Sequence, residues 1–243
     1  MFKRSPSLVQ QVKSHLKQRI VDAEFESGRI PPEADLASKL GVSRNTIRDA
    51  LSQLETEGVI FRKQGAGTFV NQAGLLVKTR LEEIIPYEQM IREHGFTPTV
   101  QLVGFDEIPA DPDMVSELKL TADEKLLIVQ KLFLADEKPV IFTRTFIPPK
   151  IIKLDYTSDH ISLPIYEFVP QFCQQEFAYY VTEIVPVVAP GWLVDRLALS
   201  PEVTALISLE EVGYNQDNEP IVKAFSYFRN DLLRLRLIRR HMH

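Results

Sequence analysis

Four polar residues in the N-terminal third of the chain have side chains of the kinds that bind DNA. They are Arg44, Asn45, Thr46 and Arg48. Arginine can donate two hydrogen bonds to the edge of guanine, asparagine can pair with adenine, and threonine can hold a phosphate group. Their types and spacing therefore predict contacts to base edges and phosphates. Solvated surface residues of an ordinary helix are the alternative explanation.

A second group of candidates lies in the segment VIFRKQGAGTFV, residues 59–70. Two short β-prone runs flank a turn that contains Lys63, Gln64, Gly65 and Gly67, which predicts a basic β-hairpin. The glycines permit close approach of the backbone to another surface, and Lys63 and Gln64 can reach phosphate or the minor groove. Any tight hairpin can use glycines, so this segment points to DNA only together with the elements before it.

Three helices must position these side chains. Apolar residues recur every three or four positions from Ser7 to about Ala23, which predicts an amphipathic helix. A second helix begins after the prolines of PPEADLASKLG and ends at Gly41. Ser43 can cap a third helix that ends at Gly58 and carries the polar residues opposite an apolar stripe. The stripe comprises Ile47, Ala50, Leu51 and Leu54. The short connection between the last two helices predicts a helix-turn-helix.

The stretch IPPEADLASKLGVSRNTIRDALSQLETEGVIFRKQGAGTFV resembles the winged helix of GntR-type regulators. By that resemblance, DNA contacts are expected from the four polar helix residues and from Gln64 and Gly65. One position departs from the family pattern. Ala34 stands where the family usually has an arginine in the second helix, which places one phosphate contact in doubt.

The charge is divided unequally along the chain. Residues 1–75 contain 11 Lys and Arg against 8 Asp and Glu, whereas residues 76–243 contain 17 against 25. A basic N-terminal part and an acidic C-terminal part are suited to a protein that contacts phosphate through its N-terminal part alone. Ordinary surface variation could produce the same difference in charge. The composition, 44% hydrophobic and 25% charged, is that of a soluble globular protein. With no bilayer-length apolar run and no signal-peptide core, a cytoplasmic location is expected.

Few residues are available for metal or covalent chemistry. Cys173 is the single cysteine, and the five histidines are scattered along the chain or lie at its end, so no disulfide, structural metal site or cofactor is expected. The sequence contains no G-x-S-x-G, H-E-x-x-H or Walker motif. No catalytic residues can therefore be identified from it.

The C-terminal part contains an internal repeat. SELKLTADEKLLIVQKLFLADEKPVIFTRTFIP and DRLALSPEVTALISLEEVGYNQDNEPIVKAFSYFR share the order helix end, acidic turn, strand, polar turn, proline, strand. Leu118 corresponds to Leu197 and Pro139 to Pro220, and the second hairpin has a turn longer by two residues. Unless the similarity is accidental, the two units pair into one antiparallel sheet with helices on one side, an α+β domain. A helix is also expected over LEEIIPYEQMIREHG, with Pro86 as a kink or as its true start.

This half resembles the effector-sensing UTRA domain of the HutC branch of GntR-type regulators, whose fold is similar to chorismate lyase. The resemblance covers roughly residues 77–240, through LADEKPVIFTRTFIPP, LPIYEFV and NQDNEPIVKAFSYFRNDLLRLRL. It implies a small-molecule pocket. Members that bind phosphorylated amino sugars use two basic residues, a serine, a tyrosine and a glutamate. The corresponding places hold Lys131 with Phe133, Pro164 with Tyr166, and Val222, so an amino-sugar phosphate is not expected.

Strand alternation predicts which side chains face this pocket. If Val222 faces it, then the alternate residues Ala224 and Ser226 of the same strand do too. The equivalent strand of the first repeat unit should then place Ile141, Thr143 and Thr145 toward the pocket. Arg144 and Lys223 should point to the opposite face. Lys131, Tyr166 and, at the start of the preceding helix, Arg80 complete the predicted site. Because no carboxylate stands at Val222, we expect an anionic effector that lacks a required amine. The predicted effector-binding residues are Arg80, Lys131, Thr143, Tyr166, Val222 and Ser226.

The resulting prediction is a DNA-binding transcription regulator, expected to be a repressor, with three parts. Residues 1–72 form the winged helix-turn-helix, residues 73–80 a linker, and residues 81–243 the effector-binding and dimerisation domain. A homodimer on a pseudo-palindromic operator follows from the few base pairs that one recognition helix can contact. Two alternatives stay open: an enzyme on a chorismate-lyase-like fold, and an architectural DNA-binding protein without an effector.

Overall fold

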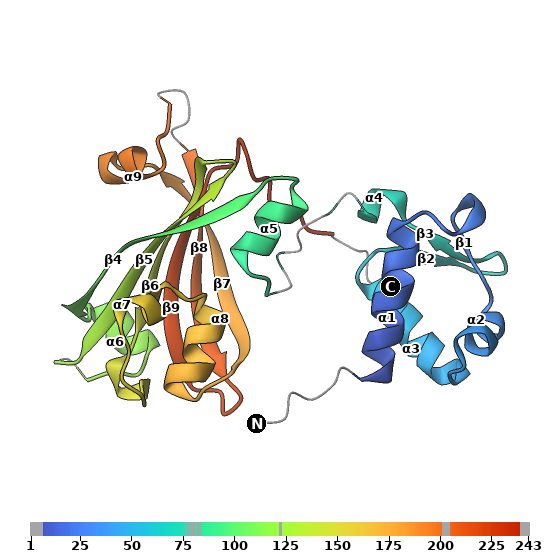
Figure 1. Cartoon of the computed structure of the whole chain (residues 1–243), viewed down its shortest axis with the longest axis horizontal. Helices are drawn as coiled ribbons and strands as arrows, with labels where there is room; N and C mark the ends of the chain where they lie inside the picture. Colours follow the sequence, from blue (N-terminus) through green and yellow to red (C-terminus); the bar gives the residue numbers. More distant parts are fainter. Residues whose placement is uncertain are drawn as a thin grey trace. The chain divides into compact units, whose positions relative to one another are not determined.

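The computed structural model describes residues 7–75, 77, 81, 84–121, 123–200 and 205–238 (Figure 1). The chain divides between residues 80 and 81 into two compact units, and the segment from residue 236 onward is grouped with the first.

The first unit contains helices α1 (Leu8–Val21), α2 (Glu33–Leu40), α3 (Arg44–Thr56) and the short α4 (Gln72–Leu75), with strands β1 (Arg29–Ile30), β2 (Ile60–Lys63) and β3 (Gly67–Val70). The strands form an antiparallel sheet in the order β1-β3-β2. Ser43 caps α3, because its hydroxyl accepts a hydrogen bond of 3.1 Å from the backbone N–H of Thr46. Gly41, at φ +66°, ends α2 in the left-handed conformation.

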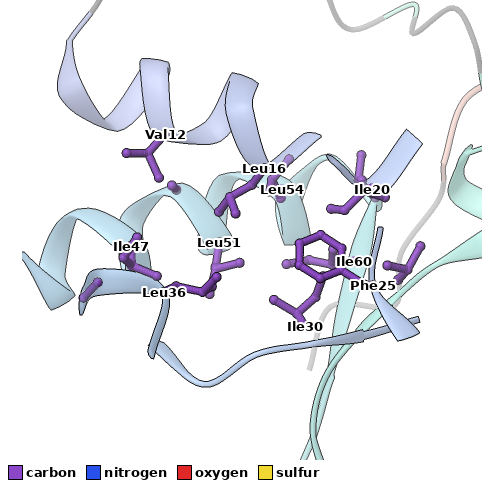
Figure 2. Close-up of a cluster of buried hydrophobic side chains, with 14 residues drawn as sticks. Val12, Leu16, Ile20, Phe25, Ile30, Leu36, Ile47, Leu51, Leu54 and Ile60 are labelled. Atoms are coloured by element: carbon purple, nitrogen blue, oxygen red, sulfur yellow. The ribbon is translucent and has the colours of Figure 1, made fainter. Parts of the chain in front are cut away.

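One apolar core joins the helices and the small sheet (Figure 2). Leu16 of α1, Leu36 of α2 and the inner stripe of α3 are almost wholly buried. The end of α3 is tied to α1 by Glu57, whose carboxylate lies 2.8 Å from Lys13 Nζ and 3.0 Å from Lys17 Nζ. Because α3 turns its apolar stripe into this core, its opposite face is left to solvent.

The second unit is built on a six-stranded antiparallel sheet in the order β4-β5-β6-β9-β8-β7. The strands are β4 (Pro98–Pro109), β5 (Lys125–Ala135), β6 (Lys138–Ile147), β7 (Phe177–Val188), β8 (Ala205–Asn215) and β9 (Pro220–Phe228). The helices are α5 (Tyr87–Glu93), α6 (Pro112–Glu117), α7 (Ser158–Ser162), α8 (Ile165–Phe168) and α9 (Gly191–Arg196). Pro86 directly precedes α5 as its N-cap, so it marks the true start of that helix.

The internal repeat is confirmed as two units, β4-α6-β5-β6 and β7-α9-β8-β9, that meet at the centre of the sheet. There β6 pairs with β9, with Arg144 opposite Phe225. The first hairpin turns over Asp136 and Glu137, both at positive φ, and the second over the four residues 216–219. The two halves are therefore related by an approximate two-fold axis through the Arg144–Phe225 pair.

Helices cover both faces of this sheet, so the expectation of helices on one side is wrong. Leu127 and Val129 of β5 share a buried cluster with Ile161 and Phe168 of α7 and α8. The alternate residues Leu126 and Ile128 share another cluster with Met114 of α6. Because successive side chains of a strand point to opposite faces, α6 lies on the face opposite α7 and α8.

Candidate nucleic-acid interface and ligand cavity

The first turns of α3 present the predicted base-contacting residues to solvent. Arg44, Asn45 and Arg48 are exposed, and Thr46 is half-buried with its hydroxyl 2.8 Å from that of Ser43. Arg48 also donates to Glu33 in the first turn of α2, at 3.1 Å, a partner that the sequence interpretation missed. Ala34, in the same turn, is exposed but has no polar group to offer a phosphate.

The loop between β2 and β3 forms the predicted hairpin wing, with Lys63, Gln64, Gly65 and Gly67 all exposed. Gly65 and Gly67 have φ values of +73° and +118°, a region that other residues rarely adopt. Arg29 donates to the carbonyl oxygen of Ala66 at 3.2 Å. Arg29 thus adds a cation to the wing, and only the pairing of β1 with β3 reveals it.

A cavity lies on the face of the large sheet that α5, α7 and α8 cover. Five of the predicted effector-binding residues line it, namely Lys131, Thr143, Tyr166, Val222 and Ser226. Thr145 and Ala224 line it as well, whereas Ile141 is buried in an apolar cluster beside it. Arg80 lies outside the described residues.

The strand alternation also places Lys223 as predicted. Its ammonium group lies 2.8 Å from Glu117 of α6, on the opposite face of the sheet. Arg144 likewise is absent from the cavity wall and lies over the ring of Phe146, 5.3 Å from its centroid. On each central strand, therefore, alternate residues line the cavity, and the residues between them point to the opposite face of the sheet.

Lys131 places a cation in the cavity wall. Its Nζ donates to the carbonyl oxygens of Ser162, at 3.1 Å, and of Leu163, at the C-terminal end of α7. Burial lowers the pKa of this ammonium group to about 8, and the nearby carboxylate of Glu88 opposes that effect. The group thus titrates close to physiological pH.

Two carboxylates, Glu88 and Glu211, also line the cavity. Glu211 accepts hydrogen bonds from the hydroxyls of Thr182, at 2.9 Å, and Tyr87, at 3.4 Å. Burial raises the pKa of Glu211, and these two hydrogen bonds oppose the rise. Carboxylates therefore do face the pocket, although none stands at Val222, so an ammonium group on a ligand would have a partner there. The repeat could have revealed Glu211, because Lys131 and Glu211 are both the seventh residue of their strands, β5 and β8.

Three tyrosines surround Glu211. Tyr87, Tyr166 and Tyr180 line the cavity together with it, and the rings of Tyr166 and Tyr180 meet edge to face with centroids 6.4 Å apart. Burial raises the pKa of each of the three phenols, and the carboxylate of Glu211 adds to the rise. The phenols stay neutral and offer hydroxyls and aromatic faces.

The described residues contain no group of three or more His, Cys, Asp or Glu arranged to hold a metal ion. Within the same part of the chain, no helix has the length and apolar character needed to span a membrane.

Both parts of the chain match known families. Residues 8–70 match the model of bacterial regulatory proteins, gntR family, and residues 93–234 match the UTRA domain. The HTH-type transcriptional repressor NagR of Bacillus subtilis strain 168 is 23% identical over 94% of this chain and 93% of its own length. The mannosyl-D-glycerate transport/metabolism system repressor MngR of Escherichia coli strain K12 is 24% identical over 92% and 90%.

Solved structures share the fold. YydK of Bacillus subtilis aligns with a TM-score of 0.76 and 15% identity, over 98% of this chain and all of that one. PhnF of Mycobacterium smegmatis aligns with a TM-score of 0.58 and 19% identity, over 95% of this chain and all of that one.

Proposed function

The chain belongs to the GntR family of bacterial regulatory proteins and carries the UTRA domain, and from this premise we propose which residues carry out its two binding functions. It is a DNA-binding transcription regulator under the control of a small-molecule effector. The relatives named as repressors support repression as its mode of action, and we propose that the effector relieves it. The observation that carries the proposal is the cavity of the second unit, whose wall, among the described residues, contains one cation, two carboxylates and several hydroxyls.

In the first unit, α3 enters the major groove. Arg44, Asn45 and Arg48 contact base edges, and Thr46 with the start of α3 contacts phosphate. The wing residues Lys63, Gln64, Gly65 and Gly67 contact the DNA backbone or the minor groove. The exposed side chains of Arg44, Asn45 and Arg48 on the helix, and of Lys63 and Gln64 on the hairpin, support this assignment.

In the second unit, the cavity binds the effector. Lys131 binds an anionic group of the effector, because its ammonium is buried and its hydrogen-bond partners are two neutral carbonyls. Thr143, Tyr166 and Ser226 supply hydroxyls, and Val222 forms part of the apolar wall. Arg80, outside the described residues, stays a candidate for the same anionic group.

The regulator acts in the cytoplasm as a homodimer on a pseudo-palindromic operator. Two-fold symmetry doubles the few base pairs that one helix contacts. The edge strand β7 supports self-association, since Val181, Ile184 and Val188 on it are 54%, 53% and 79% exposed. An unpaired apolar edge invites another strand or chain.

The alternative of an enzyme is disfavoured because the named relatives are transcription regulators. The alternative of an architectural protein without an effector is tested by ligand binding. A metabolite screen by thermal shift should find compounds that raise the melting temperature, since a ligand selective for the folded state stabilises it. Thr145→Trp, which fills the cavity, should abolish those shifts. Shifts that persist in this variant would place the ligand elsewhere and contradict the proposed site.

A further inference from the structure

Opposite charges occupy equivalent places in the two halves of the sheet. Lys131 lies on β5 opposite Thr143, and Glu211 lies on β8 opposite Ala224. The approximate two-fold axis at the β6–β9 pair exchanges these positions, so both side chains face the same cavity. Three strand spacings of about 4.8 Å separate their strands, roughly 14 Å in total. The cavity thus has a cation at Lys131, with the carboxylate of Glu88 nearby, and a separate carboxylate at Glu211.

Neither charge is neutralised by the other. Lys131 donates to two backbone carbonyls, and Glu211 accepts from two hydroxyls. Among the ion pairs of the described residues, none includes either side chain. A carboxylate can accept about four hydrogen bonds, so Glu211 keeps acceptor capacity for a ligand that enters the cavity.

The surroundings of Glu211 favour a cation over a neutral donor. Tyr87, Tyr166 and Tyr180 line the cavity close enough to Glu211 for its charge to raise the pKa of each phenol, and the rings of Tyr166 and Tyr180 stand at 72° to one another. Aromatic faces attract cations through their negative quadrupole, and several such faces beside a carboxylate form a site for ammonium groups. Phe133, two residues from Lys131 on β5, and Phe168 of α8 also line the cavity, so Glu211, and not aromatic rings alone, distinguishes the place proposed for the ammonium group.

We propose that the effector is a zwitterion whose ammonium group binds against Glu211 among Tyr87, Tyr166 and Tyr180, while its anionic group binds Lys131. This inference rests on the proposed function, because it assigns a ligand class to the same cavity. It replaces the expectation of an anion that lacks an amine. A ligand with only an anionic group would leave the carboxylate of Glu211 without a partner once water is displaced, which is unfavourable.

The test uses the full-length chain and small zwitterions, including phosphocholine, phosphoethanolamine and ω-amino carboxylates of graded length. Each is compared with its analogue without the ammonium group and its analogue without the anionic group, first by thermal shift and then by calorimetry. We expect a zwitterion to bind at least tenfold more tightly than either analogue. Glu211→Gln should remove that advantage over the deaminated analogue, and Glu211→Asp should retain part of it.

The matched control is Glu210→Gln, because Glu210 neighbours Glu211 on β8 but pairs with Phe225 and lies on the opposite face. It should leave affinity unchanged. Melting temperatures of the unliganded variants report whether each one folds. If anions bind equally well with and without an ammonium group, or if Glu211→Gln leaves the affinity of the best compound within twofold, the proposal is overturned while the cavity stays the effector site. Absence of binding by every class contradicts the proposed function as well.

Discussion

At the scale of single residues, base contacts and phosphate contacts have different consequences for specificity. Arg48→Ala should reduce discrimination between the operator and its single-base variants by about 1 to 3 kcal/mol, the usual worth of a bidentate guanine contact. Lys63→Ala should instead weaken all duplexes alike and lower the slope of log affinity against log salt by about 1. Titrations of specific and random duplexes at several salt concentrations measure both quantities. Equal losses of both variants on both kinds of DNA would refute the division between helix and wing.

The lowered pKa of Lys131 leads us to expect that effector binding depends on pH. Burial lowers its pKa to about 8, so the ammonium form that pairs with an anion is lost as the pH rises through that value. Effector affinity should therefore fall by up to tenfold per pH unit above about pH 8. Lys131→Arg should remove this dependence, because a guanidinium stays charged. Calorimetry from pH 6 to 9.5 measures the effect, and a flat wild-type profile would show that Lys131 does not bind the anionic group.

Much of the cavity was predictable at this scale, because strand alternation and the repeat select Thr143, Thr145 and Ser226 for one face. The side chains that were missed meet their partners only through the fold. Glu33 reaches Arg48 from another helix, and Arg29 reaches the wing through β1. Glu211 differs from these, because its place follows from the sequence once the two repeat units are aligned residue by residue along β5 and β8.

At the scale of elements, α4 packs against the end of α3 through a contact that permits only glycine. A Cβ on Gly74 would lie 1.9 Å from the carbonyl oxygen of Gly58, and Asn71 donates to that same oxygen at 2.8 Å. Gly74→Ala should therefore lower the free energy of unfolding by roughly 1 to 3 kcal/mol, as overpacking does. Gly104→Ala is the matched control, because no atom lies within 4 Å of its Cβ position. Equal denaturation midpoints for the two variants would contradict this close packing.

Hydrophobic periodicity was sufficient to predict α1, α2, α3 and the two hairpins of the repeat. It did not predict that helices cover both faces of the sheet, although the sequence of β5 indicates this. Its residues 126–129 are all apolar and buried, and such a continuous run indicates a strand covered on both sides. The short α7 and α8 offered no comparable pattern, because helices of four or five residues are too short to show a period.

At the scale of the whole molecule, the proposed regulator should be a homodimer. Sedimentation equilibrium should give twice the chain mass of 27.8 kDa, and a footprint should cover two half-sites related by two-fold symmetry. Val181→Lys on β7 should weaken the dimer, whereas Lys125→Glu on β5 should not. A monomer that binds one half-site with full affinity would contradict the prediction.

The most direct test of the account measures operator affinity with and without a cavity ligand. Selection from random duplexes provides the operator, the thermal-shift screen provides the ligand, and fluorescence anisotropy gives both dissociation constants. The account predicts that the ligand changes operator affinity by roughly 5- to 150-fold, the usual range of allosteric coupling, and that Thr145→Trp binds operator but no longer responds. A ligand that binds the cavity tightly and leaves operator affinity unchanged would contradict it.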